Sequence, residues 1–145
     1  MHMLFVDDDL ETLTFLKQAA ALTAFKDVDT ATSAEDALTR VVTSHYDLIT
    51  LDINMPGASG LEVLPLIRSM SPHAIIAIIS GFIPKDLSNS LAGCADVFLP
   101  KPISINTLKC LIDNVHPIHQ SLSAIRLLNR ESTPIIHTPP KNEYV

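Results

Sequence analysis

The sequence predicts an α/β fold built on a doubly wound parallel sheet. Short apolar runs alternate five times with segments of helical periodicity, and strict alternation of this kind implies parallel strands with helices on both faces. The runs are apolar throughout, which indicates strands that are buried on both sides. With 145 residues, of which 47% are hydrophobic, the chain has room for one domain with a core and a tail.

The five predicted strands are short and are bounded by polar residues or turns. They span residues 3–6, 28–31, 48–51, 74–79 and 96–99. Among doubly wound sheets of this size the natural strand order is 2-1-3-4-5, the flavodoxin-like arrangement. This order places the first strand beside the third.

The five predicted helices carry apolar residues at helical spacing. They span residues 10–20, 34–42, 61–70, 84–93 and 105–115, and the fourth has the weakest pattern. Asp9 and Ser104 are expected to be N-caps, and Thr32 with Glu35 forms a capping-box pattern.

The character of the chain changes at Pro117. We expect the main domain to occupy residues 1–116 and an additional amphipathic helix or linker to occupy residues 117–130. Four apolar residues there keep helical spacing: Ile118, Leu122, Ile125 and Leu128. Residues 131–145 contain three prolines and few core-forming residues, so they are expected to form a flexible tail.

Composition argues against several classes of protein. The net charge of −6 without a cluster of Lys or Arg argues against direct nucleic-acid binding. The longest apolar run is far shorter than the ~20 residues that cross a bilayer, and no signal-peptide pattern is present, so we expect a cytoplasmic protein. Cys94 and Cys110 are too few for a disulfide framework or a zinc site.

Polar residues stand at the carboxyl ends of four predicted strands, where open parallel sheets hold their working site. They are Asp7, Asp8 and Asp9 after the first strand, Asp52 after the third, Ser80 after the fourth and Lys101 after the fifth. Carboxylates that converge in one crevice repel one another unless a cation lies between them. An acidic site made only of oxygen ligands suits Mg²⁺ or Mn²⁺.

Each of these features also has a simpler interpretation. The three consecutive aspartates alone fit an N-cap and first-turn acids favoured by the helix dipole. Ser80 and Gly81 alone fit a turn, Lys101 alone fits a surface lysine, and Phe98 alone fits an ordinary strand aromatic. The site interpretation gains weight because Asp52 and Lys101 fall in register with the first acids.

Four motifs in order resemble the receiver domains of two-component response regulators, in particular chemotaxis-regulator-like ones. They are Phe5-Val6-Asp7-Asp8, Leu51-Asp52 with Met55-Pro56-Gly57 and Gly60, Ser80-Gly81, and Leu99-Pro100-Lys101-Pro102. The resemblance runs from about residue 4 to residue 115. It implies a signalling switch that is phosphorylated by a sensor histidine kinase or a histidine phosphotransfer protein and promotes only its own phosphorylation and dephosphorylation.

The resemblance also implies roles for individual residues. Asp52 would be the phosphoacceptor, and Lys101 would pair with the phosphoryl group. Asp7, Asp8, Asp52 and the backbone carbonyl of Asn54 would hold Mg²⁺ or Mn²⁺.

Further implied roles concern the response to phosphorylation. Ser80 would be the switch hydroxyl and would also contact the phosphoryl group, and Phe98 would be the aromatic that moves with it. The Asn54 side chain and Phe82 would tune the lifetime of the phosphate. The Lys101-Pro102 peptide bond is expected to be cis.

The output of such a switch is open at this point. We expect phosphorylation-dependent contact with a downstream protein, or an effector domain beyond this chain, and a homodimer is a further expectation. One alternative is a pseudo-receiver that binds partners without accepting phosphate. A less favoured one is an aspartyl-nucleophile phosphatase, because Glu11 stands where those enzymes place Thr or Val and no second acidic motif follows late in the chain.

Overall fold

The computed structural model describes residues 1–131, with side chains described as far as Leu128, so nearly all of the predicted tail lies outside the described residues. It contains one five-stranded parallel sheet of order β2-β1-β3-β4-β5, which confirms the predicted flavodoxin-like fold. The strands are β1 (His2–Val6), β2 (Asp27–Ala31), β3 (Leu48–Leu51), β4 (Ile75–Ser80) and β5 (Val97–Pro100). The helices are α1 (Leu10–Ala21), α2 (Ala34–Thr43), α3 (Gly60–Met70), α4 (Asn89–Ala92) and α5 (Ile105–Glu131).

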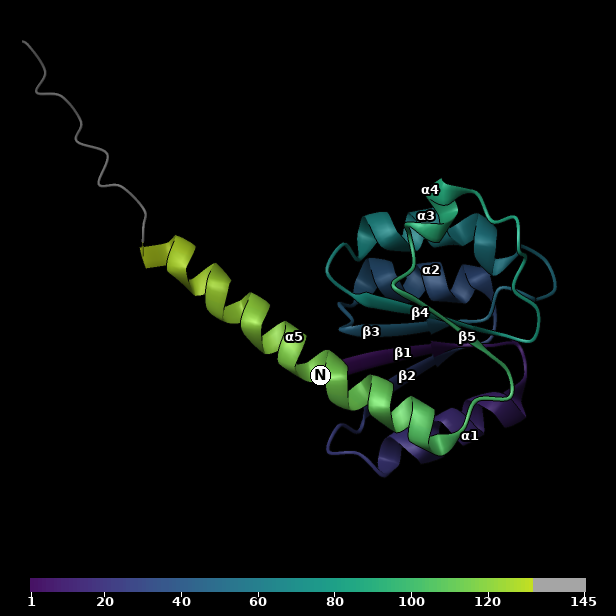
Figure 1. Cartoon of the computed structure of the whole chain (residues 1–145), viewed down its shortest axis with the longest axis horizontal. Helices are drawn as coiled ribbons and strands as arrows, with labels where there is room; N and C mark the ends of the chain where they lie inside the picture. Colours follow the sequence, from purple (N-terminus) through teal and green to yellow (C-terminus); the bar gives the residue numbers. More distant parts are fainter. Residues whose placement is uncertain (132–145) are drawn as a thin grey trace, which may run out of the picture.

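The helices cover the two faces of the sheet in two layers (Figure 1). One apolar cluster packs α2 and α3 against the strands, and a second packs α1 and α5 against the opposite face. Leu4 and Phe5 are consecutive in β1 and are fully buried, one in each cluster. Burial on both faces explains why the strands read as continuous apolar runs.

Two predicted helix boundaries differ from the structure. The N-cap of α2 is Ser33 rather than Thr32, because the Ser33 hydroxyl oxygen accepts a hydrogen bond from the Asp36 N–H at 3.1 Å. The helix predicted over residues 84–93 is reduced to the four residues of α4, none of which is buried. A segment with two leucines and no buried face has little packing to extend a helix.

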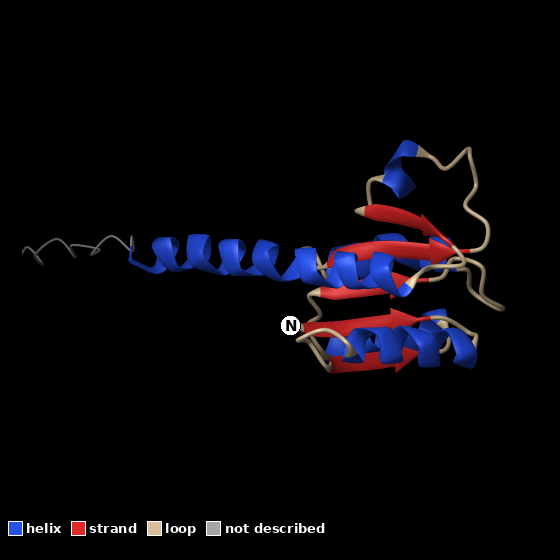
Figure 2. Cartoon of the chain, turned by 60° about the horizontal axis from the view of Figure 1, so that its bottom comes forward, coloured by secondary structure: helices blue, strands red, loops and turns tan. Residues whose placement is uncertain are grey.

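The separate helix predicted after Pro117 is instead a continuation of α5, which runs unbroken from Ile105 to Glu131 and projects from the domain (Figure 2). Pro117 is exposed and removes only one intrahelical hydrogen bond. Two residues further on, His119 Nε2 lies 2.9 Å from the Asp47 carbonyl oxygen. Within the described residues, no helix has the length and apolarity that a membrane span requires.

Arg68→Ala is expected to lower the free energy of unfolding by about 2 kcal/mol. Arg68 on α3 donates hydrogen bonds to the carbonyl oxygens of Cys94 (2.9 Å) and Ala74 (2.8 Å), and to Asp96 Oδ2 (2.6 Å). The truncation leaves these acceptors without their donor at the start of β4 and β5. Urea unfolding measures the loss.

Arg40→Ala is the matched control for this change, because Arg40 makes a partly exposed ion pair with Asp36, one turn away on the same helix α2. Such a pair contributes about 0.5 kcal/mol. Equal losses in the two variants would show that Arg68 does not connect these elements.

Candidate functional site

The acidic residues predicted at the ends of β1 and β3 meet at one edge of the sheet. Val6 is in register with Leu51, so Asp7 and Asp52 leave neighbouring strands at the same level. Asp7 and Asp52 are buried, at 2% and 4% exposure, and Asp8 is exposed. One carboxylate oxygen from each of the three lies within 4.8 Å of the other two. The predicted convergence is therefore present in the fold.

Lys101 reaches this acidic group from the end of β5. The backbone N–H of Lys101 donates to the Ser80 carbonyl oxygen at 2.9 Å, which continues the pairing of β4 and β5 to the edge of the sheet. The Lys101–Pro102 peptide bond is cis, as predicted. Lys101 Nζ lies 2.6 Å from Asp7 Oδ2 and 2.7 Å from Asp52 Oδ2, so a single ammonium group bridges two buried carboxylates.

The charges of this bridge alter the proton affinities of its members. Burial raises the pKa of Asp7, although the bond from Lys101 acts against the shift. For Lys101, burial lowers the pKa, but the bonds to Asp52 and Asp7 outweigh it and the net shift is upward. The lysine therefore stays charged between the two acids.

Ser80 and Asn54 occupy the other side of the Asp52 carboxylate. Asp52 Oδ1 accepts hydrogen bonds from the Ser80 hydroxyl and from the Asn54 backbone N–H, both at 2.9 Å. The Asn54 side-chain amide donates to Ser80 Oγ at 2.7 Å and to the Phe82 carbonyl oxygen at 3.0 Å. With Lys101 on Oδ2, both oxygens of Asp52 are held by donors.

The side chains of Asp9, Phe82 and Phe98 make no hydrogen bond to this group. Asp9 is the N-cap of α1, as predicted, and its bond from the Thr12 hydroxyl lowers its pKa. The Phe82 side chain is 67% exposed. Phe98 is half-buried and packs against the cluster on the α2–α3 side of the sheet.

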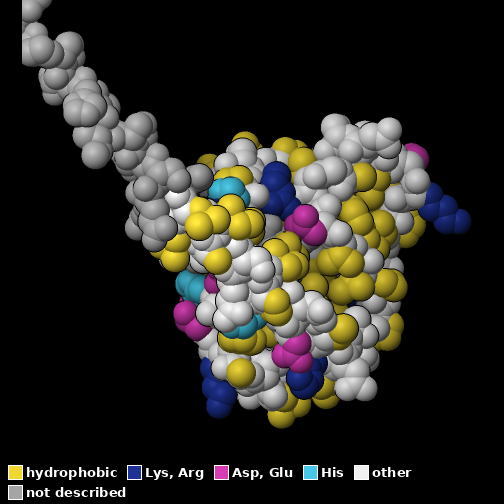
Figure 3. All heavy atoms as spheres, turned by 60° about the vertical axis from the view of Figure 1, so that its left-hand side comes forward, with side chains coloured by type: hydrophobic (Ala, Val, Ile, Leu, Met, Phe, Trp, Pro, Cys, Tyr) yellow, Lys and Arg dark blue, Asp and Glu magenta, His cyan; other side chains and the backbone are white. Residues whose placement is uncertain are grey.

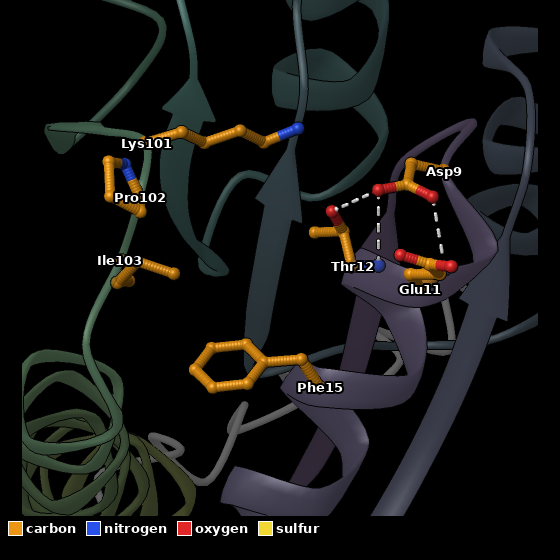
Figure 4. A pocket seen from close by; sticks show the side chains of 7 residues that line it. All are labelled: Asp9, Glu11, Thr12, Phe15, Lys101, Pro102 and Ile103. Carbon is orange, nitrogen blue, oxygen red and sulfur yellow. Dashed lines mark hydrogen bonds between the residues drawn. The ribbon is translucent and has the colours of Figure 1, made fainter.

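Two features of the site were not predicted from the sequence. Gly60 was noted only as part of a motif, yet a Cβ at this position would lie 2.4 Å from the Asp52 carbonyl oxygen, so the close approach of α3 to β3 requires glycine. A hollow of about 370 Å³ also opens beside Lys101, between α1 and the segment leading into α5 (Figure 4). In the sequence, the sign of this hollow is that Glu11 and Phe15 are four residues apart and therefore lie on the same face of α1, the face that lines it.

Comparison with known proteins identifies the family. A family model of the response regulator receiver domain matches residues 3–113. The chain belongs to the response regulator receiver family. This result confirms the resemblance found in the sequence and supports it over the phosphatase alternative.

Solved structures and curated regulators resemble this receiver domain. The response regulator TrrA of Thermotoga maritima, solved in complex with Mg²⁺-BeF, is 32% identical with a TM-score of 0.70, covering 79% of this chain and 99% of that one. An adenylate cyclase structure from Rhodopirellula baltica is 27% identical with a TM-score of 0.76, covering 90% and 98%. The transcriptional regulatory protein YvrH of Bacillus subtilis is 31% identical over 102 residues, which are 70% of this chain and 43% of YvrH. The receiver domain therefore spans less than half of that relative.

Asp7→Asn is expected to remove a pH-dependent loss of stability in metal-free buffer. The folded pKa of Asp7 is raised above its ordinary value of 3.8, so its contribution to stability is fully present below the unfolded pKa. That contribution is lost as the pH rises through the folded pKa. The free energy of unfolding of the unchanged chain, relative to the variant, should therefore fall as the pH rises above the ordinary carboxyl pKa of 3.8, as measured by urea unfolding.

Asp9→Asn is the control of opposite sign. The pKa of Asp9 is lowered, so its contribution is present above the unfolded pKa and is lost as the pH falls through the folded pKa. The same pH slope in both variants would contradict the assignment of burial as the cause at Asp7.

Proposed function

We propose that this receiver domain is a phosphoacceptor switch that is phosphorylated on Asp52 by a histidine kinase or a histidine phosphotransfer protein. The observation that carries the proposal is the environment of the Asp52 carboxylate. It is buried, it lies at the carboxyl edge of the sheet, and it is flanked by one lysine, one hydroxyl group and two further acids. A carboxylate so placed is a nucleophile for phosphoryl transfer.

The proposed step is an in-line displacement at phosphorus. A bond forms between an Asp52 carboxylate oxygen and phosphorus, and the bond from phosphorus to the donor nitrogen or oxygen breaks, with its electron pair leaving on the donor. Lys101 Nζ and the Ser80 hydroxyl already donate to Asp52. After transfer these two donors are within reach of the new phosphoryl oxygens, whose negative charge they stabilise.

A divalent cation, Mg²⁺ or Mn²⁺, is part of the proposal. Asp7, Asp8 and Asp52 offer three carboxylate oxygens within 4.8 Å of one another, and the backbone carbonyl of Asn54 would complete the protein ligands. Oxygen donors of this kind suit hard cations, and the exposed Asp8 leaves the group open to solvent. When bound, such an ion supplies positive charge that offsets the charge of the phosphoryl group.

The response to phosphorylation is proposed to pass through Ser80 and Phe98. Ser80 bonds Asp52 directly, and Phe98 lies on β5 in register with Ile78, two residues before Ser80 on β4. The Asn54 amide ties Ser80 to the Phe82 backbone, which supports the proposal that Asn54 and Phe82 tune the lifetime of the phosphate. Output would follow by contact with a downstream protein or through an effector domain outside this chain.

Phosphorylation by a small donor tests the proposal. The purified chain is incubated with acetyl phosphate and Mg²⁺ and its intact mass is recorded, with a parallel sample in EDTA. We expect one phosphoryl adduct that forms only with the metal and is released by hydroxylamine, as an acyl phosphate is. A folded chain that binds Mg²⁺ but forms no adduct with acetyl phosphate or with a histidine phosphodonor would instead identify a pseudo-receiver.

A further inference from the structure

The part of α5 that extends beyond the domain carries an exposed apolar stripe. Ile118 and Ile125 are 45% and 59% exposed, and Leu122 lies between them on the same face. Figure 3 shows hydrophobic side chains gathered next to the point where the grey trace begins. The stripe continues toward the domain in one repeat, with alternating steps of four and three residues: Leu111, Val115, Ile118, Leu122 and Ile125. Steps of four and three are the heptad pattern of a coiled coil.

The domain covers the start of this repeat, where Val115 is buried and Leu111 is half-buried, but it does not cover the part with Ile118 and Ile125. Leu108, Ile112 and Val115 are the α5 residues buried against the sheet. At about 3.6 residues per turn, the centre of the Ile118 and Ile125 stripe lies roughly a quarter of a turn away from that buried face. The contact of His119 with Asp47 holds the helix in this orientation at the edge of the domain.

We propose that the stripe pairs with the same stripe on a second copy of this chain as a parallel, two-stranded coiled coil. A straight apolar stripe is self-complementary about a two-fold axis that runs along the helix. Between residues 117 and 128 the sequence has a single charged residue, Arg126. In a parallel pair Arg126 would face Ser121 of the second copy across the seam, so no like charges oppose the association.

The size of the seam predicts a reversible dimer. Each buried Leu or Ile removes on the order of 100 Å² of apolar surface from water. The stripe then buries a total well below the roughly 1,200 Å² of standard stable interfaces. We therefore expect a monomer–dimer equilibrium that shifts with protein concentration. This proposal is independent of phosphorylation, so its failure would leave the proposed function untouched.

Sedimentation equilibrium of the full chain tests the pairing, with two variants matched in exposure. Ile125 and Leu127 are 59% and 58% exposed, but Leu127 lies on the opposite side of the helix, where it lines a hollow with Met1. Ile125→Asn removes two seam side chains from each dimer and is expected to raise the dimer dissociation constant at least about tenfold, whereas Leu127→Asn should leave it unchanged. A monomer at every concentration, or equal effects of the two variants, would overturn the proposal.

Disulfide cross-linking tests the parallel register. In a chain with Cys94→Ser and Cys110→Ser, we expect Ile118→Cys and Ile125→Cys each to form a symmetric cross-linked dimer on mild oxidation, because equivalent seam positions meet at the axis. Leu127→Cys is the control and should not cross-link. A cross-link that forms only when the Ile118→Cys and Ile125→Cys chains are mixed would show an antiparallel pair and overturn the proposed arrangement.

Discussion

Asp52→Asn is expected to abolish the phosphoryl adduct while leaving the fold intact. An amide oxygen is too weak a nucleophile to displace a phosphoryl group, and the substitution keeps the size of the side chain. The oxygen that accepts from the Asn54 N–H and the Ser80 hydroxyl, both at 2.9 Å, can still do so. Intact mass after incubation with acetyl phosphate and Mg²⁺ measures the adduct, and circular dichroism checks the fold.

Two further variants separate the acceptor from its surroundings. Asp9→Asn changes an acid two residues from Asp7 that caps α1, and it should retain the adduct. Lys101→Met should slow adduct formation without abolishing it, because the nucleophile remains while a charge-stabilising donor is lost. An adduct that persists in Asp52→Asn and disappears in Asp8→Asn would move the acceptor to the other carboxylate.

Gly60→Ala is expected to cost about 3 kcal/mol of unfolding free energy. An alanine Cβ would lie 2.4 Å from the Asp52 carbonyl oxygen and 2.7 Å from Ile53 Cα. Both atoms belong to the backbone, so no side chain can rotate away, and α3 must move from the end of β3. The same shift displaces Asp52, which carries the proposed nucleophile. We therefore expect a lower free energy of unfolding in urea and slower formation of the phosphoryl adduct.

Gly81→Ala is the control for this substitution. A Cβ at Gly81 meets no atom within 4 Å, and the residue has no positive φ. The free energy of unfolding should change by no more than about 0.5 kcal/mol. Equal losses at the two glycines would contradict the steric account of Gly60.

The sheet and the convergence of the acids were predictable because both follow from burial and topology. Strands with both faces covered are apolar throughout, as Leu4 and Phe5 illustrate by pointing into opposite clusters. Once the order 2-1-3-4-5 is assumed, β1 and β3 are neighbours. Asp7 and Asp52 must then leave the sheet together.

The parts that were not predictable depend on distances or on competition between weak local preferences. The bridge of Lys101 between Asp7 and Asp52 depends on how far β5 extends, which a residue pattern does not specify. Proline normally predicts a helix boundary, but α5 continues through Pro117. On either side of it, Val115 is buried against the sheet and His119 contacts the Asp47 carbonyl oxygen, and both contacts hold the helix in place. The reduction of α4 has the opposite cause, since helical spacing without burial is a weak preference.

The unbroken course of α5 has a mechanical consequence. His119 contacts Asp47 just before β3. From His119 to Glu131 the helix extends by about 18 Å at 1.5 Å per residue. A continuous helix of that length acts as a lever arm. A tilt of about 10° where α5 leaves the domain moves the far end of this 18 Å segment by about 3 Å. Small rearrangements at the base of α5 are therefore magnified at its Glu131 end.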